Sequence, residues 1–202
     1  MPSCLRSLKI FKRGFERMAG WTVWITGLPG SGKSTVTRRL VRKLHVINVE
    51  AQVLSSDALR KLLTPKATYS DWERDMVYEG LARLAALLAE NDVNVIIDAT
   101  GNHRRYRDRA RRLIPRFLEV YLKCSLDVCI RRESSRRMTR GAPRRIYQRA
   151  KEKAAPGVPG MGAPYEEPLH PELTLESDRL TVEECAEVIL RTIQRRFLSA
   201  KK

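Results

Sequence analysis

The stretch Trp21–Thr35 has the sequence WTVWITGLPGSGKST, and the rest of the chain is arranged around it. It begins with an apolar run over residues 21–26 that has the length and composition of a β-strand. The segment Gly27–Ser34 then matches the pattern G-x-x-x-x-G-K-[ST] in full, and residues 36–44 have the composition of a helix. A strand, a glycine-rich turn and a helix in this order are the setting in which this pattern binds phosphate.

The residue types of the turn explain its chemistry. Glycine permits backbone angles and close approaches that a side chain would block. Successive N–H groups can therefore point into one concavity and meet phosphate oxygens. The helix that follows adds the positive end of its dipole. We predict that Lys33 lies along the β and γ phosphates of a nucleoside triphosphate and that the Ser34 hydroxyl binds Mg²⁺.

Composition indicates one soluble globular domain in the cytoplasm. The chain has 202 residues, of which 43% are hydrophobic, and this is enough for one well-buried core. No apolar run approaches the ~20 residues of a membrane span, so we expect no transmembrane segment. The cysteines form no CxxC pair and have no zinc-type spacing, which indicates free thiols in a reducing cytosol. They are Cys4, Cys124, Cys129 and Cys185.

The chain is strongly basic, with 39 Lys and Arg against 23 Asp and Glu and a net charge of +16. Such a surface attracts polyanions. The positive charge is explained equally well by an anionic partner that binds this surface and by arginine side chains that are merely solvated, and both explanations stay open. A homodimer is a separate possibility that the sequence leaves open.

Alternating strand and helix patterns predict a single α/β domain over residues 21–198. Residues 1–20 form a basic amphipathic extension that lacks the features of a secretory signal, and residues 199–202 form a tail. We interpret the extension as non-essential. The alternatives are a transit-like leader, a helix that lies on a membrane surface, and an upstream start codon that precedes the true start at Met18. Strands are predicted at 21–26, 49–54, 93–98, 117–122 and 171–175, with helices between and after them. The expected fold is the three-layer P-loop NTPase fold, with a five-stranded mostly parallel sheet, helices on both faces and a lid.

Two helices carry clear starting signals. Ser70 is a candidate N-cap for a long helix over 71–90, and Thr181-Val182-Glu183-Glu184 is a capping box. The apolar spacing predicts buried faces on both helices. For the first the residues are Met76, Leu81, Leu84 and Leu88, and for the second Cys185, Val188, Ile189, Ile193 and Phe197.

The region at about 133–163 is irregular and rich in arginine, and it ends in a glycine- and proline-rich run. A long loop of this kind in a compact enzyme is often a lid, although a disordered basic segment is the alternative. A small domain with a basic lid suits phosphoryl transfer to a small acceptor. Asp57 and Asp98 each stand at the carboxyl end of a predicted strand, where α/β sheets place ligands. One of them would hold the Mg²⁺ water shell and the other would orient the acceptor hydroxyl.

Several segments together resemble the adenylylsulfate kinase family. They are ITGLPGSGKST, LSSDALR, HRRYRDRAR, and above all PGVPGMGAPYEEPLHPELTLESDRLTVEECAEVIL near the end. The resemblance covers residues from about 21 to 190. It implies an ATP- and Mg²⁺-dependent kinase that phosphorylates the 3′-hydroxyl of adenosine 5′-phosphosulfate in sulfate assimilation. Its small-molecule partner would be that nucleotide.

The resemblance also implies residue roles. The residues assigned to ATP are Gly27, Leu28, Pro29, Gly30, Ser31, Gly32, Lys33, Ser34 and Thr35, and we add Arg132. Those assigned to the acceptor nucleotide are Arg60, Tyr69 and Arg74, with the Tyr69 ring stacked on its adenine. Lys33, Asp57 and Arg149 are the catalytic candidates, and Ser34, Asp57 and Asp98 are those for the metal. Arg149 occupies a lid position that the family usually fills with lysine, so the charge is kept but not the point geometry.

Four departures from the family pattern bear on the acceptor. Ser55 replaces the first acid of D-G-D, Val77 replaces an asparagine and Val158 replaces an aromatic. The segment 99–102, ATGN, stands where the family has F-I-S-P. Its I-D-A-T sequence followed by arginines resembles a wider group of small kinases for polynucleotide ends, sugars or nucleotide sugars. A related kinase with another acceptor is therefore one alternative. The other is a basic nucleotide-dependent nucleic-acid-binding protein, against which stands the lack of an RNA- or DNA-binding motif.

Overall fold

A five-stranded parallel sheet forms the centre of the computed structural model, which describes residues 19–136, 145–152 and 157–199. Its strand order is β2-β3-β1-β4-β7. The bounds are β1 Thr22–Thr26, β2 Gln52–Ser55, β3 Val95–Asp98, β4 Phe117–Lys123 and β7 Leu173–Glu176. All neighbouring strands run parallel, so their carboxyl ends meet at one edge of the sheet. The predicted fold class is confirmed.

Strands β1, β2, β3 and β7 begin one to three residues later than the sequence predicts, and for β2 and β3 the reason is that the preceding helices end in turns that use extra residues. Asn48 and Asp92 adopt the left-handed region, with φ of 56° and 63°. The Val49 and Val93 amides donate to the carbonyls of Leu44 and Leu88, both at 3.0 Å. Such bonds close a helix C-terminus. β2 and β3 therefore start at Gln52 and Val95 instead of 49 and 93.

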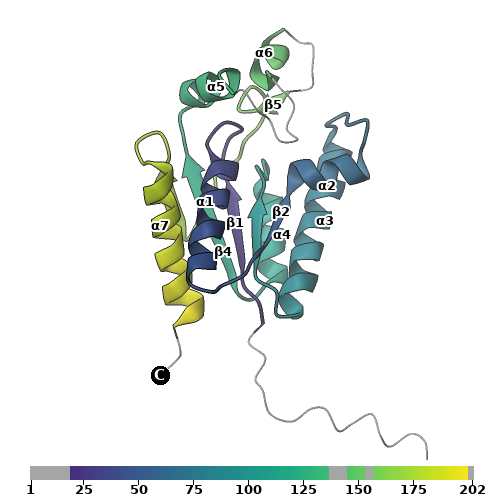
Figure 1. The fold of residues 1–202 in the computed structure, drawn as a ribbon. Coiled ribbons are helices and arrows are strands. Elements are labelled where there is room, and N and C mark those ends of the chain that lie inside the picture. Colours follow the sequence, from purple (N-terminus) through teal and green to yellow (C-terminus); the bar gives the residue numbers. More distant parts are fainter. Residues whose placement is uncertain (1–18, 137–144, 153–156, 200–202) are drawn as a thin grey trace, which may run out of the picture.

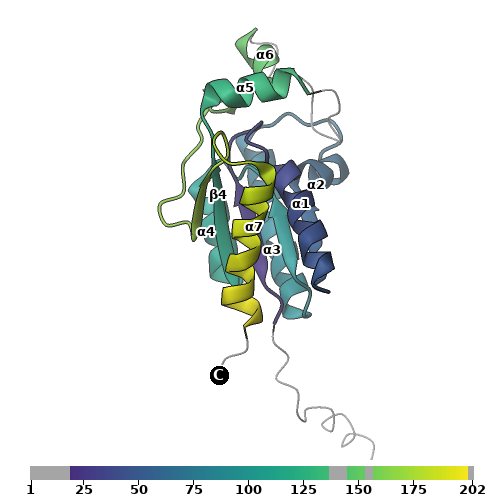
Figure 2. The same ribbon diagram turned by 60° about the vertical axis from the view of Figure 1, so that its left-hand side comes forward.

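Helices cover both faces of the sheet (Figures 1 and 2). α1 (Lys33–Val46) and α7 (Val182–Ile193), which continues into a π-helix at Gln194–Leu198, pack on one face. α3 (Asp71–Glu90) and α4 (Arg104–Leu113) pack on the other. α2 (Ser56–Leu63), α5 (Leu126–Ser134), α6 (Ile146–Lys151) and the short strands β5 (Val158–Pro159) and β6 (Gly162–Ala163) lie toward the carboxyl edge of the sheet.

Alternation along the strands divides the core into two layers. On β1, Val23 and Ile25 face the α1 and α7 side, whereas Trp24 faces α3 and α4. The predicted helix faces are partly wrong, since Leu84 and Val188 are both 37% exposed. Small residues take much of the buried face of α3, because this helix packs closely against α4 and the sheet: Ala82, Ala85, Ala86 and Ala89.

Both predicted helix starts are confirmed. The Ser70 side chain accepts from the Glu73 amide at the start of α3, and Thr181 and Glu184 form the capping box of α7. The segments 1–18, 137–144, 153–156 and 200–202 lie outside the described residues, and with them most of the predicted extension, part of the lid and the tail. Among the helices that the structure does describe, none is long and apolar enough to cross a membrane.

Candidate active site

The phosphate loop lies between the end of β1 and the start of α1, as predicted. A Cβ atom added to Gly27 would lie 2.6 Å from the Leu122 carbonyl oxygen, and one added to Gly30 would lie 2.4 Å from that of Cys129. Both glycines also have positive φ, so only glycine fits there. A Cβ added to Gly32, by contrast, would have no atom of the described residues within 4 Å apart from those of its chain neighbours. The phosphate loop, which we also call the phosphate cradle, is therefore packed closely against Leu122 and Cys129 at its first two glycines and is open at Gly32. Phosphate binding requires such an open position.

The Lys33 side chain lies under this loop and is 9% exposed. Its ammonium donates to the carbonyls of Gly27 at 2.9 Å and Leu28 at 3.0 Å. Burial lowers the pKa of Lys33 below its ordinary value, while the charges of Asp98 and Asp57 oppose that shift. An ammonium that is desolvated and hydrogen-bonded to neutral carbonyl oxygens would be stabilised further by an anion such as a phosphate.

The strand-end carboxylates meet beside this lysine. Ser55 and Asp98 are register partners on β2 and β3, and Asp57 lies in the first turn of α2, directly after β2. Burial raises the pKa of Asp98, with Asp57 adding to the shift, whereas Lys33 and a hydrogen bond with the Ser34 side chain oppose it. Ser34, Asp57 and Asp98 thus bring hard oxygen donors together next to the phosphate cradle, and such donors suit Mg²⁺.

A second cluster consists of Arg60, Tyr69 and Arg74, which come from α2, the following loop and α3; we name it the acceptor cluster after the role predicted for it. The Arg60 guanidinium carbon lies 4.7 Å from the centre of the Tyr69 ring, and that of Arg74 lies 5.9 Å from it. Both arginine residues are 6% exposed. Burial raises the pKa of Tyr69, and the charges of Arg60, Arg74 and Arg149 act against it. Two guanidinium groups around one aromatic ring can bind a planar base and an anionic group together.

The lid contacts both halves of the site. The Tyr147 hydroxyl on α6 donates to the Pro29 carbonyl of the phosphate loop at 2.8 Å. The Arg74 Nη2 donates to the Gly157 carbonyl, which precedes β5, at 3.1 Å. Arg149, also on α6, is exposed and close enough to act on Tyr69 electrostatically. The contacts of Tyr147 and Gly157 were not foreseen from sequence, because neither residue stands out in a local pattern.

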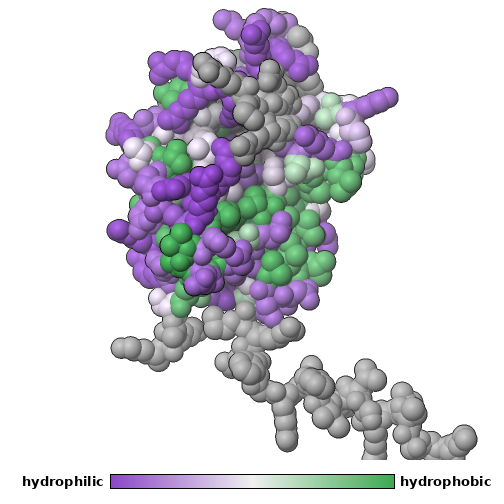
Figure 3. All heavy atoms as spheres, viewed as in Figure 1, coloured by the Kyte–Doolittle hydropathy of each residue, from purple (hydrophilic) through white to green (hydrophobic). Residues whose placement is uncertain are grey.

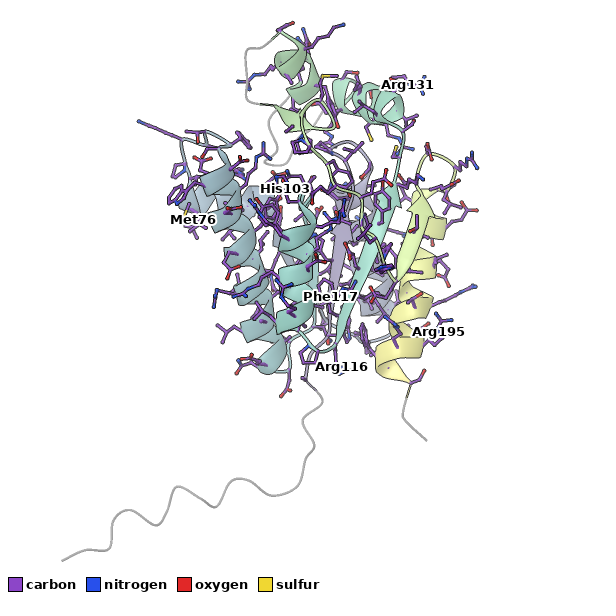
Figure 4. All side chains as sticks on the ribbon, turned by 180° about the vertical axis from the view of Figure 1, so that it is seen from behind. Met76, His103, Arg116, Phe117, Arg131 and Arg195 are labelled. Carbon is purple, nitrogen blue, oxygen red and sulfur yellow. The ribbon has the colours of Figure 1, made fainter. Side chains whose placement is uncertain are left out.

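Arg132, on α5, is connected to the phosphate loop through Ser177. Its Nη2 donates to the Ser177 carbonyl at 2.8 Å, and the Ser177 hydroxyl donates to the Ser31 carbonyl at 2.8 Å. In the view from behind (Figure 4), the neighbouring Arg131 on α5 lies at the same end of the molecule as Met76 and His103, whereas Arg116 and Arg195 lie at the other end. Of the sequence-predicted site residues, the structure brings Lys33 near Asp57 and Asp98, and it brings Arg60 and Arg74 against the Tyr69 ring.

The positions that depart from the family pattern have structural roles. Val77 is fully buried in the α3 and α4 core layer, and Val158 is 8% exposed in a cluster with Cys129 and Tyr147. Backbone groups of segment 99–102 are held by buried side chains: the Trp24 Nε1 donates to the Ala99 carbonyl at 3.0 Å. The Thr26 hydroxyl donates to the Thr100 carbonyl at 2.6 Å. This segment is thus fixed by its backbone.

Comparisons with known proteins find relatives over most of the chain. The family model described as adenylylsulphate kinase matches residues 19–176. A probable adenylyl-sulfate kinase of Pyrococcus abyssi is 34% identical over 174 residues, which are 86% of this chain and 95% of the relative. An adenylyl-sulfate kinase of Rippkaea orientalis is 33% identical over 178 residues, 88% of this chain and 93% of the relative.

Solved structures extend the comparison. The Mycobacterium tuberculosis APS kinase CysC in complex with AMPPNP and APS is similar with a TM-score of 0.77 and 31% identity, over 87% of this chain and 98% of that one. A gluconokinase from Sinorhizobium meliloti has a TM-score of 0.59 at 21% identity, over 89% of this chain and 94% of that one, and so shares the fold.

Proposed function

This chain belongs to the adenylylsulphate kinase family, and on that premise we propose that it transfers the γ-phosphate of ATP to the 3′-hydroxyl of adenosine 5′-phosphosulfate. The observation that carries the proposal is the meeting of two clusters at one edge of the sheet. The phosphate cradle with Lys33 lies on one side, and Arg60, Tyr69 and Arg74 lie on the other. Asp57 is in α2 together with Arg60 and so links the two clusters.

On the donor side, we assign the loop Gly27–Thr35 and Arg132 to ATP. The backbone amides of the loop and the N-terminal end of α1 stabilise the negative charge of the phosphates. Lys33 leaves the carbonyls of Gly27 and Leu28 and binds the β and γ phosphates, where its charge has greater effect in a desolvated site. Ser34 and Asp98 would hold Mg²⁺, which supplies charge neutralisation between the phosphates.

On the acceptor side, Tyr69 stacks on the adenine while Arg60 and Arg74 bind the anionic phosphosulfate. Asp57 faces the same Lys33 as Asp98 does, and it lies on the helix that carries Arg60. We assign Asp57 to the acceptor hydroxyl, whose proton it accepts as the γ-phosphate is transferred. Asp57 would also contribute to holding Mg²⁺, together with Ser34 and Asp98. Arg149 comes from the lid and compensates the charge that develops on the transferred group.

The lid at about 133–163 excludes water, so that the γ-phosphate moves to the acceptor hydroxyl and not to water. The hydrogen bonds of Tyr147 with Pro29 and of Arg74 with Gly157 support this role, because they join the lid to both substrate clusters.

One assay tests the proposed reaction. The purified protein is mixed with Mg²⁺ and ATP, together with adenosine 5′-phosphosulfate, a 5′-hydroxyl oligonucleotide, or no acceptor, and ADP release is followed. Release that depends on adenosine 5′-phosphosulfate is the expected result. Release with the oligonucleotide alone would assign the chain to the related kinases that the I-D-A-T segment resembles. Salt-sensitive nucleic-acid binding without acceptor-dependent turnover would favour a binding protein.

We further propose a place in sulfate assimilation in the cytoplasm, an anionic surface partner and a homodimer. The net charge of +16 supports the anionic partner. Apolar side chains exposed on α2 and α3 support the homodimer, and Figure 3 shows hydrophobic residues gathered over these helices. They include Leu62, Leu63, Trp72, Leu84 and Leu87. Light scattering at two salt concentrations separates a dimer from a monomer.

A further inference from the structure

We propose that Glu73 is a positioning residue, which holds Arg60 and Tyr69 in one arrangement before the acceptor nucleotide arrives. The inference rests on the proposed function, because that function places Arg60 and Tyr69 at the acceptor site. Glu73 lies in the first turn of α3 and is 6% exposed. A carboxylate buried to this degree is unusual and requires partners that compensate its charge.

The partners of Glu73 are the loop before α3 and the guanidinium of Arg60. Its Oε1 and Oε2 both lie 2.9 Å from the Thr68 amide nitrogen, and its Oε2 accepts from the Tyr69 amide at 2.7 Å. The same Oε2 lies 3.5 Å from Arg60 Nη1. One carboxylate thus fixes both the backbone that carries the Tyr69 ring and the arginine that lies against that ring.

The backbone of Tyr69 needs such support. Its φ of 58° lies in the left-handed region, which costs free energy for a residue with a bulky side chain. Hydrogen bonds from the Thr68 and Tyr69 amides to a charged acceptor stabilise this conformation. The ring is then held 4.7 Å from the Arg60 guanidinium carbon, and the acceptor cluster is preformed.

The charge on Glu73 persists at neutral pH. Burial alone would raise the pKa of Glu73, but the Thr68 and Tyr69 hydrogen bonds and the charge of Arg60 together hold it below its ordinary value. The Glu73 carboxylate reaches past the N-cap residue of α3: it accepts from the Thr68 and Tyr69 amides, while the Ser70 side chain caps the helix by accepting from the Glu73 amide at 3.3 Å. The Glu73 side chain is therefore available to the loop and to Arg60.

Three variants separate positioning from helix capping. Glu73→Gln keeps the shape and removes the charge, and Glu73→Asp keeps the charge on a shorter side chain. Ser70→Ala removes the cap, together with the hydrogen bond from the Thr68 hydroxyl, and leaves the Glu73 carboxylate in place. We expect Glu73→Gln to raise the KM for adenosine 5′-phosphosulfate about tenfold, as for a lost hydrogen bond to a charged group, and Glu73→Asp to raise it about threefold. The KM for ATP stays within about twofold in both, and Ser70→Ala lowers the melting temperature without changing the acceptor KM.

An unchanged acceptor KM in Glu73→Gln would overturn the proposal, and so would an equal rise in the KM for ATP or the same rise in Ser70→Ala. If Glu73→Gln does not fold, an unchanged acceptor KM in Glu73→Asp would overturn the proposal. A second readout does not depend on the substrate: the signal of the Arg60 Nη1 protons, which face Glu73, in NMR spectra at low temperature. We expect slow solvent exchange of these protons in the wild type and in Ser70→Ala, and fast exchange in Glu73→Gln.

An Arg60 signal that stays protected in Glu73→Gln contradicts the positioning role whatever the acceptor is. A wild-type protein that turns over no adenosine 5′-phosphosulfate, but whose Arg60 signal behaves as expected, contradicts the proposed function and leaves the positioning role standing.

Discussion

The guanidinium of Arg74 joins the acceptor cluster to the lid, since its Nη2 donates to the Gly157 carbonyl at 3.1 Å while its Nε donates to the Tyr69 carbonyl at 3.0 Å. The residue is 6% exposed, so these bonds form away from bulk water. Planar arginine can serve two carbonyls at fixed directions in a way that a lysine ammonium on a flexible stem does not.

Arg74→Lys is therefore expected to loosen the lid as well as to weaken acceptor binding. We expect a KM for the acceptor that rises about tenfold, as for a lost bidentate contact, and faster tryptic cleavage at Arg149 and Lys151 in the free protein. Limited proteolysis followed by mass spectrometry measures the second effect. Wild-type cleavage rates in Arg74→Lys would show that the bond with Gly157 does not restrain the lid.

Lys33→Ala removes the ammonium that the structure holds beneath the phosphate loop. We expect turnover to fall by roughly 100-fold or more, because charge on the γ-phosphate then lacks its nearest compensation. Steady-state ADP release measures the loss, and circular dichroism checks that the fold is retained. Near-normal turnover in a folded variant would refute the role of Lys33.

Arg60→Ala tests whether the acceptor cluster serves the acceptor. The change removes a guanidinium 4.7 Å from the Tyr69 ring, whereas the phosphate loop is untouched. We expect the KM for adenosine 5′-phosphosulfate to rise about tenfold or more, with little change in the KM for ATP. The reverse pattern, with ATP binding weakened and acceptor binding retained, would place Arg60 at the donor site.

Asp98→Asn should stabilise the fold while it lowers activity. Burial raises the pKa of Asp98, and Asp57 adds to the shift, so the folded state binds this proton more tightly than the unfolded chain does. The free energy of unfolding therefore falls as pH rises from the unfolded pKa, about 3.9, through the higher folded value. The asparagine does not ionise, so we expect a higher melting temperature than wild type at pH 7 and almost no difference at pH 3.

Thermal unfolding of both proteins across this pH range measures the effect of Asp98→Asn. A variant that is less stable than wild type at pH 7 would contradict the account, as would a gain in stability that persists at pH 3. Turnover at pH 7 is the companion measurement, since the asparagine cannot supply the charge that the metal site requires.

Local patterns were enough to predict the phosphate loop and the fold. The loop depends on glycines and a lysine that are close in sequence, and each strand is an apolar run of ordinary length. Ser70 and Thr181 could be identified as caps because a capping interaction spans only a few residues. The burial of Leu84 and Val188 was predicted wrongly, since the periodicity of a helix does not reveal how wide its covered face is.

The rest of the site depends on contacts between distant segments. Tyr147 and Pro29 lie 118 positions apart in the chain, and no local pattern connects a lid tyrosine with a loop carbonyl. Glu73 resembles an ordinary first-turn acid of a helix, and only the folded loop shows that its carboxylate accepts from Thr68 and Tyr69 and faces Arg60. Tertiary contacts of this kind could not be predicted from one sequence.

The identity of the phosphorylated product tests the central claim most directly. The protein is incubated with ATP labelled on its γ-phosphate, Mg²⁺ and adenosine 5′-phosphosulfate, and the labelled nucleotide is isolated and characterised by phosphorus NMR. We predict that the label appears on the 3′-oxygen of the adenosine, with one ADP formed for each phosphate transferred. Label found only as free phosphate, or only on an added 5′-hydroxyl oligonucleotide, would contradict the account.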